Sequence, residues 1–289
     1  MRRWLVFLIT VFLCAEGSFS VVKAADLADP FAVPAVEQTA RVPIIMYHLV
    51  TANGKYLGRY GITPGELESD LRYLQENEYT AVLMGDLIAF VEQGRLLPEN
   101  PVVLTFDDGN CSDYQYLYPL LKKYNCKAVL SVMGKETDEC TKGKEKYPSA
   151  RYPNMTWAQI KELHESGYVE IQSHGYDVHG ALGSGKRKNE SLEAYRLRFK
   201  QDLSHLQTRC LEELNDKPNT FTYPLGVIGK GSKEALVEMG FSASLSCFEG
   251  VNILKTGDSE GLFRLKRCIR PGGSSIKNAL ERAKKVTAY

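Results

Sequence analysis

The sequence lacks an excess of charge of either sign. Its 289 residues carry 36 Lys and Arg against 35 Asp and Glu, which gives a formal net charge of +1. Nucleic-acid-binding domains usually carry a basic surplus, so this balance argues against a nucleic-acid partner. The sequence also shows no internal repeat and no low-complexity tract. Both absences, with 44% hydrophobic residues, favour a single folded domain with one sizeable core.

An apolar run long enough to cross a membrane is missing as well. Two arginines precede the apolar segment Trp4–Leu13, Glu16 interrupts the apolar character, and two alanines follow further on. A membrane-spanning helix needs about 20 apolar residues. The order of basic, apolar and small residues is instead typical of a secretory signal peptide. We therefore predict a signal peptide at residues 1–24, a linker at 25–40, and a secreted or cell-surface protein, with an uncleaved membrane anchor as the alternative.

Closely spaced cysteine pairs are also absent. Six cysteines follow the signal segment and none forms a C-x-x-C pair, which argues against a zinc knuckle or a redox motif. An even number of cysteines outside the cytoplasm permits disulfides. Buried free thiols are an equally good interpretation, and the sequence does not choose between the two. The cysteines are Cys111, Cys126, Cys140, Cys210, Cys247 and Cys268.

What the sequence has is an alternation of strand-like and helix-like segments. Short runs of apolar or β-branched residues predict strands covered on both faces, as in parallel sheets. These runs are Val42–Tyr47, Thr80–Met84, Val102–Phe106, Lys127–Val132, Val169–Ser173, Thr220–Tyr223, Ser242–Cys247 and Phe263–Ile269. Helix starts are predicted at Thr63 and Thr156, which begin capping boxes, and at Ser191 and Ser232. This alternation predicts an α/β fold, open or closed into a barrel, in one domain at residues 41–289.

Polar residues follow several predicted strands directly. Asp107 and Asp108 follow one strand, and His174 and His179 follow another. In a (β/α) barrel such residues gather at the carboxyl ends of the strands. One carboxylate and two imidazoles would make a three-ligand site for Zn²⁺ or a similar ion, which lowers the pKa of a bound water and polarises an amide carbonyl. The second carboxylate could act as general base, provided that the strand breaks at Gly109, because consecutive strand residues point to opposite faces.

The segment Thr105–Gly109 resembles the first motif of the polysaccharide deacetylases, carbohydrate esterase family 4, and the two histidines resemble the second motif. The resemblance spans Val42 to Pro271. It implies a distorted (β/α) barrel of seven or eight strands. It also implies Asp107 as catalytic base and one divalent metal ion, with Zn²⁺ in first place and Co²⁺, Ni²⁺ or Fe²⁺ as alternatives. The implied metal ligands are Asp108, His174 and His179.

The sequence departs from the commonest family pattern in its histidines. Four residues separate His174 from His179 instead of three, which is similar to the branch that deacetylates poly-N-acetylglucosamine. The Leu-x-His motif that usually ends the family pattern is absent, since no histidine follows His205. Met46-Tyr47-His48 resembles its replacement in the same branch, where the motifs are permuted. The resemblance therefore implies His48 as the general acid.

The third family motif is also altered. It usually supplies an arginine that orients the base and a backbone N–H for an oxyanion hole. Here Leu225 could supply the N–H, since such a donor needs no particular side chain. The arginine is absent from this segment. Arg264, Arg267 and Arg270, on the late predicted strand, could replace it, and Arg267 and Arg270 are the preferred candidates.

The resemblance implies a monomeric, metal-dependent hydrolase that removes N-acetyl groups from an N-acetylglucosamine polysaccharide, either poly-N-acetylglucosamine or peptidoglycan. Association with the membrane or the cell wall is an expectation for an exported enzyme of this kind. Two alternatives stay open. One is an O-acetyl esterase that acts on xylan or another wall glycan, and the other is a non-catalytic glycan-binding domain.

Overall fold

A computed structural model of the chain describes residues 37–143 and 153–285, which belong to one compact unit. The predicted signal peptide and most of the predicted linker lie outside the described residues. Within the two described ranges, no helix has the length and apolarity needed to cross a membrane.

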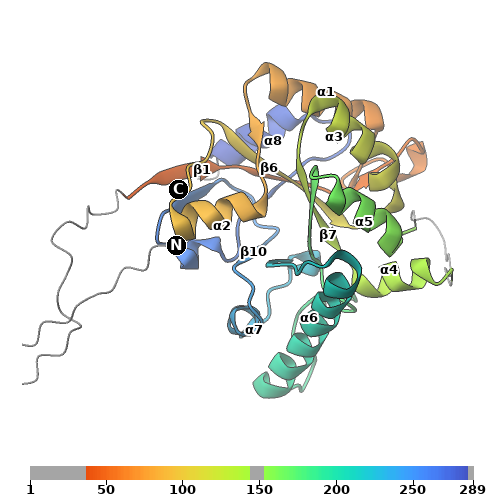
Figure 1. Cartoon of the computed structure of the whole chain (residues 1–289), viewed down its shortest axis with the longest axis vertical. Helices are drawn as coiled ribbons and strands as arrows, with labels where there is room; N and C mark the ends of the chain where they lie inside the picture. The colour runs from red at the N-terminus through yellow and green to blue at the C-terminus, as the bar shows by residue number, and fades with distance from the viewer. Residues whose placement is uncertain (1–36, 144–152, 286–289) are drawn as a thin grey trace, which may run out of the picture. The chain divides into compact units, whose positions relative to one another are not determined.

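The centre of the fold is an eight-stranded sheet in which every pair of neighbouring strands is parallel (Figure 1). Its order is β10-β9-β8-β7-β6-β2-β12, and β5 pairs with β6 beside that path. The bounds are β2 (Ile44–Tyr47), β5 (Thr80–Ala81), β6 (Pro101–Asp108), β7 (Ala128–Val132), β8 (Val169–Ser173), β9 (Thr220–Thr222), β10 (Ala243–Leu245) and β12 (Cys268–Ile269). The predicted (β/α) barrel is confirmed, as a single-domain parallel sheet in the form of a half-barrel with helices around it.

The segment Leu265–Ile269 connects the two edges of this sheet. Leu265 makes an isolated parallel bridge with Leu245 in β10, and Cys268 and Ile269 pair with β2. The predicted strand Phe263–Ile269 is therefore interrupted. Arg264 has a φ of 62°, a left-handed conformation that ordinary residues rarely adopt and that breaks an extended chain.

Two smaller sheets stand beside the main one. β1 (Thr39–Val42) pairs antiparallel with β11 (Asn252–Lys255), and β3 (Leu49–Val50) pairs with β4 (Gly61–Ile62). The predicted strand Val42–Tyr47 is thus divided between two sheets at Pro43, which has no N–H to donate to a ladder. β1 also begins two residues before the expected domain boundary at residue 41.

Eight α-helices are described, and the starts of four were predicted. Thr63, Thr156 and Ser191 are N-caps as expected, whereas Ser232 is the first residue of its helix and Gly231 is the N-cap. Thr63 and Glu66 form a capping box at α1, with Glu66 N–H to Thr63 Oγ1 at 3.1 Å, and Thr156 and Gln159 form another at α5. The helices are α1 (Pro64–Glu76), α2 (Met84–Gln93), α3 (Tyr118–Tyr124), α4 (Gly134–Thr141), α5 (Trp157–Glu165), α6 (Leu192–Leu214), α7 (Ser232–Glu238) and α8 (Ile276–Lys285). Short helical turns are η1 (Gly54–Tyr56), the π-helix η2 (Asp113–Leu117), η3 (Pro224–Gly226) and η4 (Ser259–Leu262).

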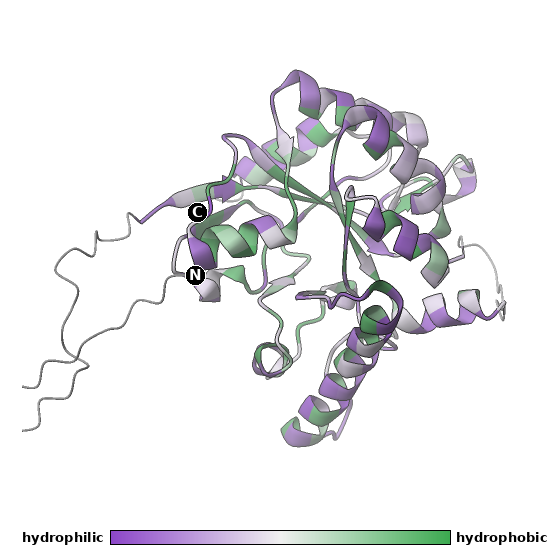
Figure 2. Cartoon of the chain, viewed as in Figure 1, coloured by the Kyte–Doolittle hydropathy of each residue, from purple (hydrophilic) through white to green (hydrophobic). Residues whose placement is uncertain are grey.

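The two faces of β6 pack differently. Leu104 and Phe106 belong to a core cluster with residues of α1, α3, α5 and α8, whereas Val103 packs in a second cluster with α2. The central strands are correspondingly hydrophobic in Figure 2. Because side chains alternate along a strand, Thr105 and Asp107 share the face of Val103. That face is the inner face of the half-barrel. Asp107 therefore lies inside the half-barrel, near the carboxyl end of β6.

Candidate active site

Asp107 and Arg267 form a buried ion pair at the carboxyl end of β6. Arg267 donates from Nη1 to Oδ1 of Asp107 at 2.8 Å and from Nη2 to Oδ2 at 2.9 Å, and the exposed fractions of the two side chains are 0% and 2%. Arg267 also donates to Thr105 Oγ1 and to the carbonyl of Ser246. Burial, the largest single effect, raises the pKa of the Asp107 carboxyl. The charges of Arg267, His48 and His174 and the hydrogen bonds from Arg267 together outweigh it, so the pKa lies below its ordinary value. Asp107 is therefore held as an oriented carboxylate.

Asp108 turns away from its neighbour because the strand breaks there. Asp108 has a φ of 79° and Gly109 a φ of 74°, and both values lie in the left-handed region. A Cβ atom on Gly109 would lie 3.3 Å from Cγ1 of Val132, so the turn also passes close to β7. The loop is fixed by Asn154, which donates to the Asp108 carbonyl, and by the Met155 N–H, which donates to the Gly109 carbonyl. The predicted break at Gly109 is present.

Asp108 lies beside both histidines of the second motif. Its Oδ1 is 3.5 Å from Nε2 of His174 and 3.4 Å from Nε2 of His179. One ligand atom from each of the three residues lies within 4.8 Å of the others. Nδ1 of His174 is 2.9 Å from the Thr222 carbonyl, which can only accept, so Nδ1 carries the proton and Nε2 presents a lone pair.

This donor set is suited to a metal ion. Oδ1 of Asp108 is buried and has no hydrogen-bond partner in the described structure, although two imidazole nitrogens face it. Acceptor atoms that converge in this way need a cation or a proton between them. One carboxylate oxygen and two imidazole nitrogens, with a backbone acceptor behind one ring, form the ligand pattern of mononuclear zinc sites.

His48 stands at the rim of the same site. It follows β2, and its Nε2 lies 3.8 Å from Oδ2 of Asp107. Its ring is tilted against Tyr60, with 4.7 Å between the centroids, and its side chain is 20% exposed. Burial lowers the pKa of His48 below its ordinary value. The structure therefore brings His48 to Asp107, from a strand that neighbours β6 in the sheet.

Leu225 lies in a strained turn after β9. Its φ is 57°, the left-handed region, and its side chain is 58% exposed. Such strain in a residue other than glycine gathers at functional sites. A Cβ atom on the next residue, Gly226, would lie 2.8 Å from Cβ of Cys247, whose Sγ is 3.9 Å from Nη2 of Arg267. The turn thus belongs to the same end of the half-barrel as the ion pair.

Comparison with known proteins matches this arrangement to one family. The sequence profile described as polysaccharide deacetylase matches residues 95–244. The chain belongs to the polysaccharide deacetylase family. The matched range contains Asp107, Asp108, both histidines and Leu225 and leaves out His48 and Arg267, which agrees with a permuted order of motifs.

Individual relatives and solved structures agree with the family. YxkH of Bacillus subtilis is 25% identical over 239 residues, which cover 82% of this chain and 75% of that protein. The poly-β-1,6-N-acetyl-D-glucosamine N-deacetylase of Escherichia coli is 26% identical over 205 residues, 64% of this chain but only 30% of that protein. A de-N-acetylase from Aggregatibacter actinomycetemcomitans has a TM-score of 0.71 at 28% identity and covers 83% of this chain and 100% of that one. IcaB from Ammonifex degensii has a TM-score of 0.69 at 25% identity, with coverage of 84% and 97%.

One predicted residue of this polysaccharide deacetylase lies elsewhere. Arg270 does not contact Asp107; it donates from Nε to Oδ2 of Asp70 at 2.7 Å and from Nη1 to Glu66, both in α1. Tyr47 also donates to Asp70, at 3.2 Å. Arg267 and Arg270 flank β12 on opposite sides, so only Arg267 faces the interior of the half-barrel. Our expectation for Arg270 is corrected: it anchors α1 and α8, since the Ile276 N–H also donates to Asp70.

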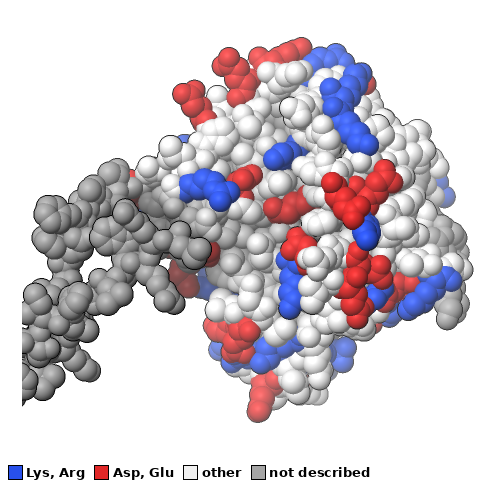
Figure 3. Space-filling view, viewed as in Figure 1, with Lys and Arg blue, Asp and Glu red and all other residues white. Residues whose placement is uncertain are grey.

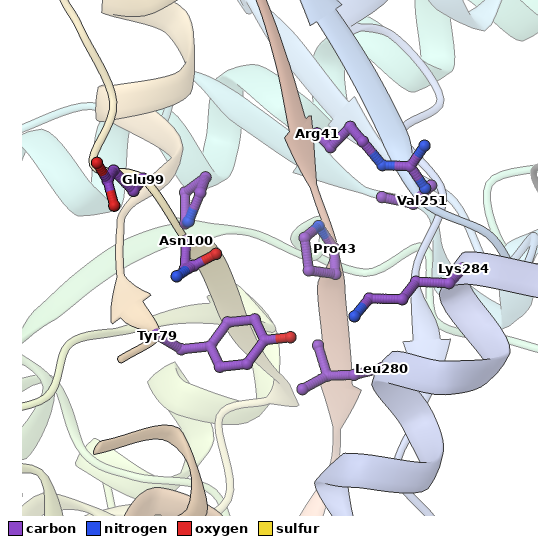
Figure 4. A pocket seen from close by; sticks show the side chains of 9 residues that line it. Arg41, Pro43, Tyr79, Glu99, Asn100, Val251, Leu280 and Lys284 are labelled. Carbon is purple, nitrogen blue, oxygen red and sulfur yellow. The ribbon is translucent and has the colours of Figure 1, made fainter. Parts of the chain in front are cut away.

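The cysteines and the remaining surface of the polysaccharide deacetylase complete the description. All six cysteines that follow the N-terminal segment fall within the described ranges, and all are free thiols. Acidic and basic side chains are interspersed on the face shown in Figure 3. A cavity of about 240 Å³ lies among Arg41, Tyr79, Glu99, Leu280 and Lys284 (Figure 4). It borders Pro43 and Pro101, which precede β2 and begin β6, so it lies at the end of the sheet opposite to the candidate active site.

Proposed function

We propose that this chain is a metal-dependent hydrolase that removes N-acetyl groups from an N-acetylglucosamine polysaccharide. The observation that carries the proposal is the convergence of Asp108, His174 and His179 beside the buried Asp107–Arg267 pair. Proteins of Escherichia coli and Staphylococcus aureus named poly-β-1,6-N-acetyl-D-glucosamine N-deacetylase favour that polymer as substrate, with peptidoglycan as the alternative. The chain spans 30% and 64% of those two proteins. The similarity therefore supports a shared reaction in the matched domain and does not extend to the other parts of those proteins.

Asp108, His174 and His179 would hold one divalent ion, Zn²⁺ in first place. Bound there, the ion would activate a water molecule and polarise the acetamide carbonyl. The protein contributes a rigid cradle for it, because His174 is fixed through Nδ1 to Thr222 and Asp108 through the strained turn at Gly109. The side chains of His174 and Asp108 are therefore oriented for binding before the ion is bound.

The other residues act on protons and on developing charge. Asp107 accepts the proton of the attacking water, while the two N–H donors of Arg267 keep its carboxylate ionised and aimed. The Leu225 N–H, in an exposed turn, donates to the oxygen of the tetrahedral acetamide carbon. His48 gives its proton to the departing amine nitrogen. Acetate and a free amino sugar are the products.

The N-terminal residues support a location for this activity. The order of basic, apolar and small residues before residue 25 is that of a secretory signal peptide. We infer export of a monomeric enzyme, cleaved or anchored, to the compartment where polysaccharides are accessible.

The test measures acetate release from β-1,6- and β-1,4-linked N-acetylglucosamine oligomers, peptidoglycan and acetylated xylan, with added Zn²⁺ or Co²⁺ and with a chelator. The two neighbouring aspartates provide matched variants. Asp107→Asn should lower kcat by about 10²–10⁴ while metal still binds, and Asp108→Asn should lose the metal. Release only from xylan would replace this proposal with an esterase. If a chelator left acetate release unchanged, the metal would have no part in the reaction.

A further inference from the structure

The two histidines of the metal cluster are held in different ways. The ring of His174 is bonded to the Thr222 carbonyl, and its backbone N–H donates to the Val132 carbonyl at 2.9 Å. In the described part of the chain, the ring of His179 faces Asp108, with its Nε2 3.4 Å from Oδ1, and has no hydrogen bond to another element. The position of His179 is therefore set by the main-chain turn that precedes it, Gly175–Val178.

One side of this turn is held by the start of α4. The Gly134 N–H donates to the Gly175 carbonyl at 3.1 Å, and the Lys135 N–H donates to the Tyr176 carbonyl at 3.0 Å. The first N–H groups of a helix have no partner inside the helix, so they are available for such contacts. The approach is close, since a Cβ atom on Gly134 would lie 2.5 Å from Cδ2 of Tyr176.

The other side of the turn is held by Asp202, which lies in α6. Its Oδ1 accepts the Tyr176 N–H at 2.8 Å, and its Oδ2 accepts the Asp177 N–H at 2.7 Å. Charge-assisted bonds of this length are among the stronger hydrogen bonds in proteins. Gly175 has a φ of 86°, and a Cβ atom there would lie 3.1 Å from Oδ1 of Asp202 and 2.2 Å from Cγ2 of Val178. The carboxylate and the turn are thus closely packed.

Side-chain contacts of the turn cannot replace this anchor. Tyr176 donates from its hydroxyl to Oδ2 of Asp138 at 3.0 Å, and its ring stacks on His205 with 3.6 Å between the centroids. These contacts fix the ring of Tyr176, whereas Asp202 fixes the main-chain N–H groups and so the direction in which the chain continues to His179. The two carboxylate oxygens act on consecutive peptide units, which restricts both backbone angles between them.

We infer that Asp202 is a positioning residue for the metal ligand His179, because its carboxylate holds the turn that carries this histidine. The inference rests on the metal site of the proposed function. Nothing in the sequence near the two histidines indicates Asp202, which follows them on a separate helix.

The test compares Co²⁺ binding by the full chain and by Asp202→Ala and Asp202→Asn, followed by calorimetry and by the visible absorption of the bound ion. We expect Co²⁺ affinity to fall about tenfold or more in Asp202→Ala, with a changed absorption spectrum. In the absence of metal, we expect the amides of residues 176 and 177 to exchange hydrogen faster in Asp202→Ala than in the unaltered chain. Asn keeps one side-chain oxygen, so Asp202→Asn should recover part of the affinity and serves alone if the alanine variant does not fold.

Glu193→Gln is the matched control, because Glu193 is an exposed acid in the first turn of the same helix. It should leave affinity and spectrum unchanged. Wild-type affinity and spectrum in both Asp202 variants, with Co²⁺ bound normally by the unaltered chain, would overturn this inference and leave the proposed function standing. Absence of Co²⁺ binding by the unaltered chain would overturn the proposed metal site and this inference with it.

Discussion

The buried pair of Asp107 and Arg267 makes a strong prediction about stability. The Arg267 side chain has 0% exposure and donates to Asp107, Thr105 and Ser246. Arg267→Met removes the guanidinium that is bonded to both oxygens of the Asp107 carboxylate, whose side chain is 2% exposed. Breaking a buried pair on one side costs about 3–5 kcal/mol, because the remaining charge is left without compensation. We expect a loss of this size in the free energy of unfolding at pH 7.

Asp107→Asn should cost less, about 1–3 kcal/mol, because the guanidinium keeps its bonds to Thr105 and Ser246. The double variant removes both charges together. Its cost should therefore fall at least about 2 kcal/mol below the sum of the two single costs, since contacting residues are strongly coupled.

The assay is urea-induced unfolding of all four proteins without metal, followed by circular dichroism. Arg196→Met is the control, since Arg196 pairs with Glu238 at the surface and its side chain is 32% exposed. Its cost should stay below about 1 kcal/mol. Single-variant costs that add to within about 0.5 kcal/mol would refute the argument that the two charges stabilise each other.

Three further predictions follow from other contacts. Arg270→Met should destabilise the protein by about 3 kcal/mol, because Asp70 loses its partner, yet acetate-release kcat should change less than about threefold; a larger change would return Arg270 to the active site. Leu225→Gly keeps the N–H and relieves the left-handed conformation, so it should stabilise by about 1 kcal/mol and preserve kcat; loss of kcat would show that the leucine side chain matters. Burial acts to raise the pKa of Asp138, but bonds from Trp157, Arg209 and Tyr176 bring it below its ordinary value. Its stabilising effect is therefore present above about pH 4 and lost as pH falls further; Asp138→Asn should cost more at pH 7 than at pH 3, in urea titrations at both values.

The sequence was informative wherever one local pattern controls the structure. Thr63 and Thr156 carry complete capping boxes, and α1 and α5 begin directly after them. The β8 strand has the predicted bounds because Val169–Ser173 is a buried run that ends at a histidine. The metal cluster could be anticipated for the same reason, since Asp108 ends one strand of the parallel sheet and His174 and His179 follow another.

Features that depend on distant partners could not be predicted. Whether Arg267 or Arg270 points into the half-barrel depends on the register of the two-residue strand β12 between them. The left-handed conformation of Arg264 interrupts the predicted strand, and this interruption could not be read from the sequence. Helix α2 begins after Leu83, which has no side chain that can cap a helix, so the usual N-cap signal of Ser, Thr, Asp or Asn was missing from the sequence. The role inferred for Asp202 depends on backbone donors in another element, and a backbone N–H has no signature in a sequence.

The order of strands in the sheet has a consequence for how this protein acquires its structure. The β2 strand lies between β6 and β12, and Arg267 follows Asp107 by 160 positions in the chain. During synthesis the carboxylate appears long before its counter-ion, and contacts so distant in sequence form slowly. Leu265–Ile269 bridges β10 and β2 and carries Arg267, so a chain cut before this segment would lack both the contacts that join the two edges of the sheet and the counter-ion of Asp107.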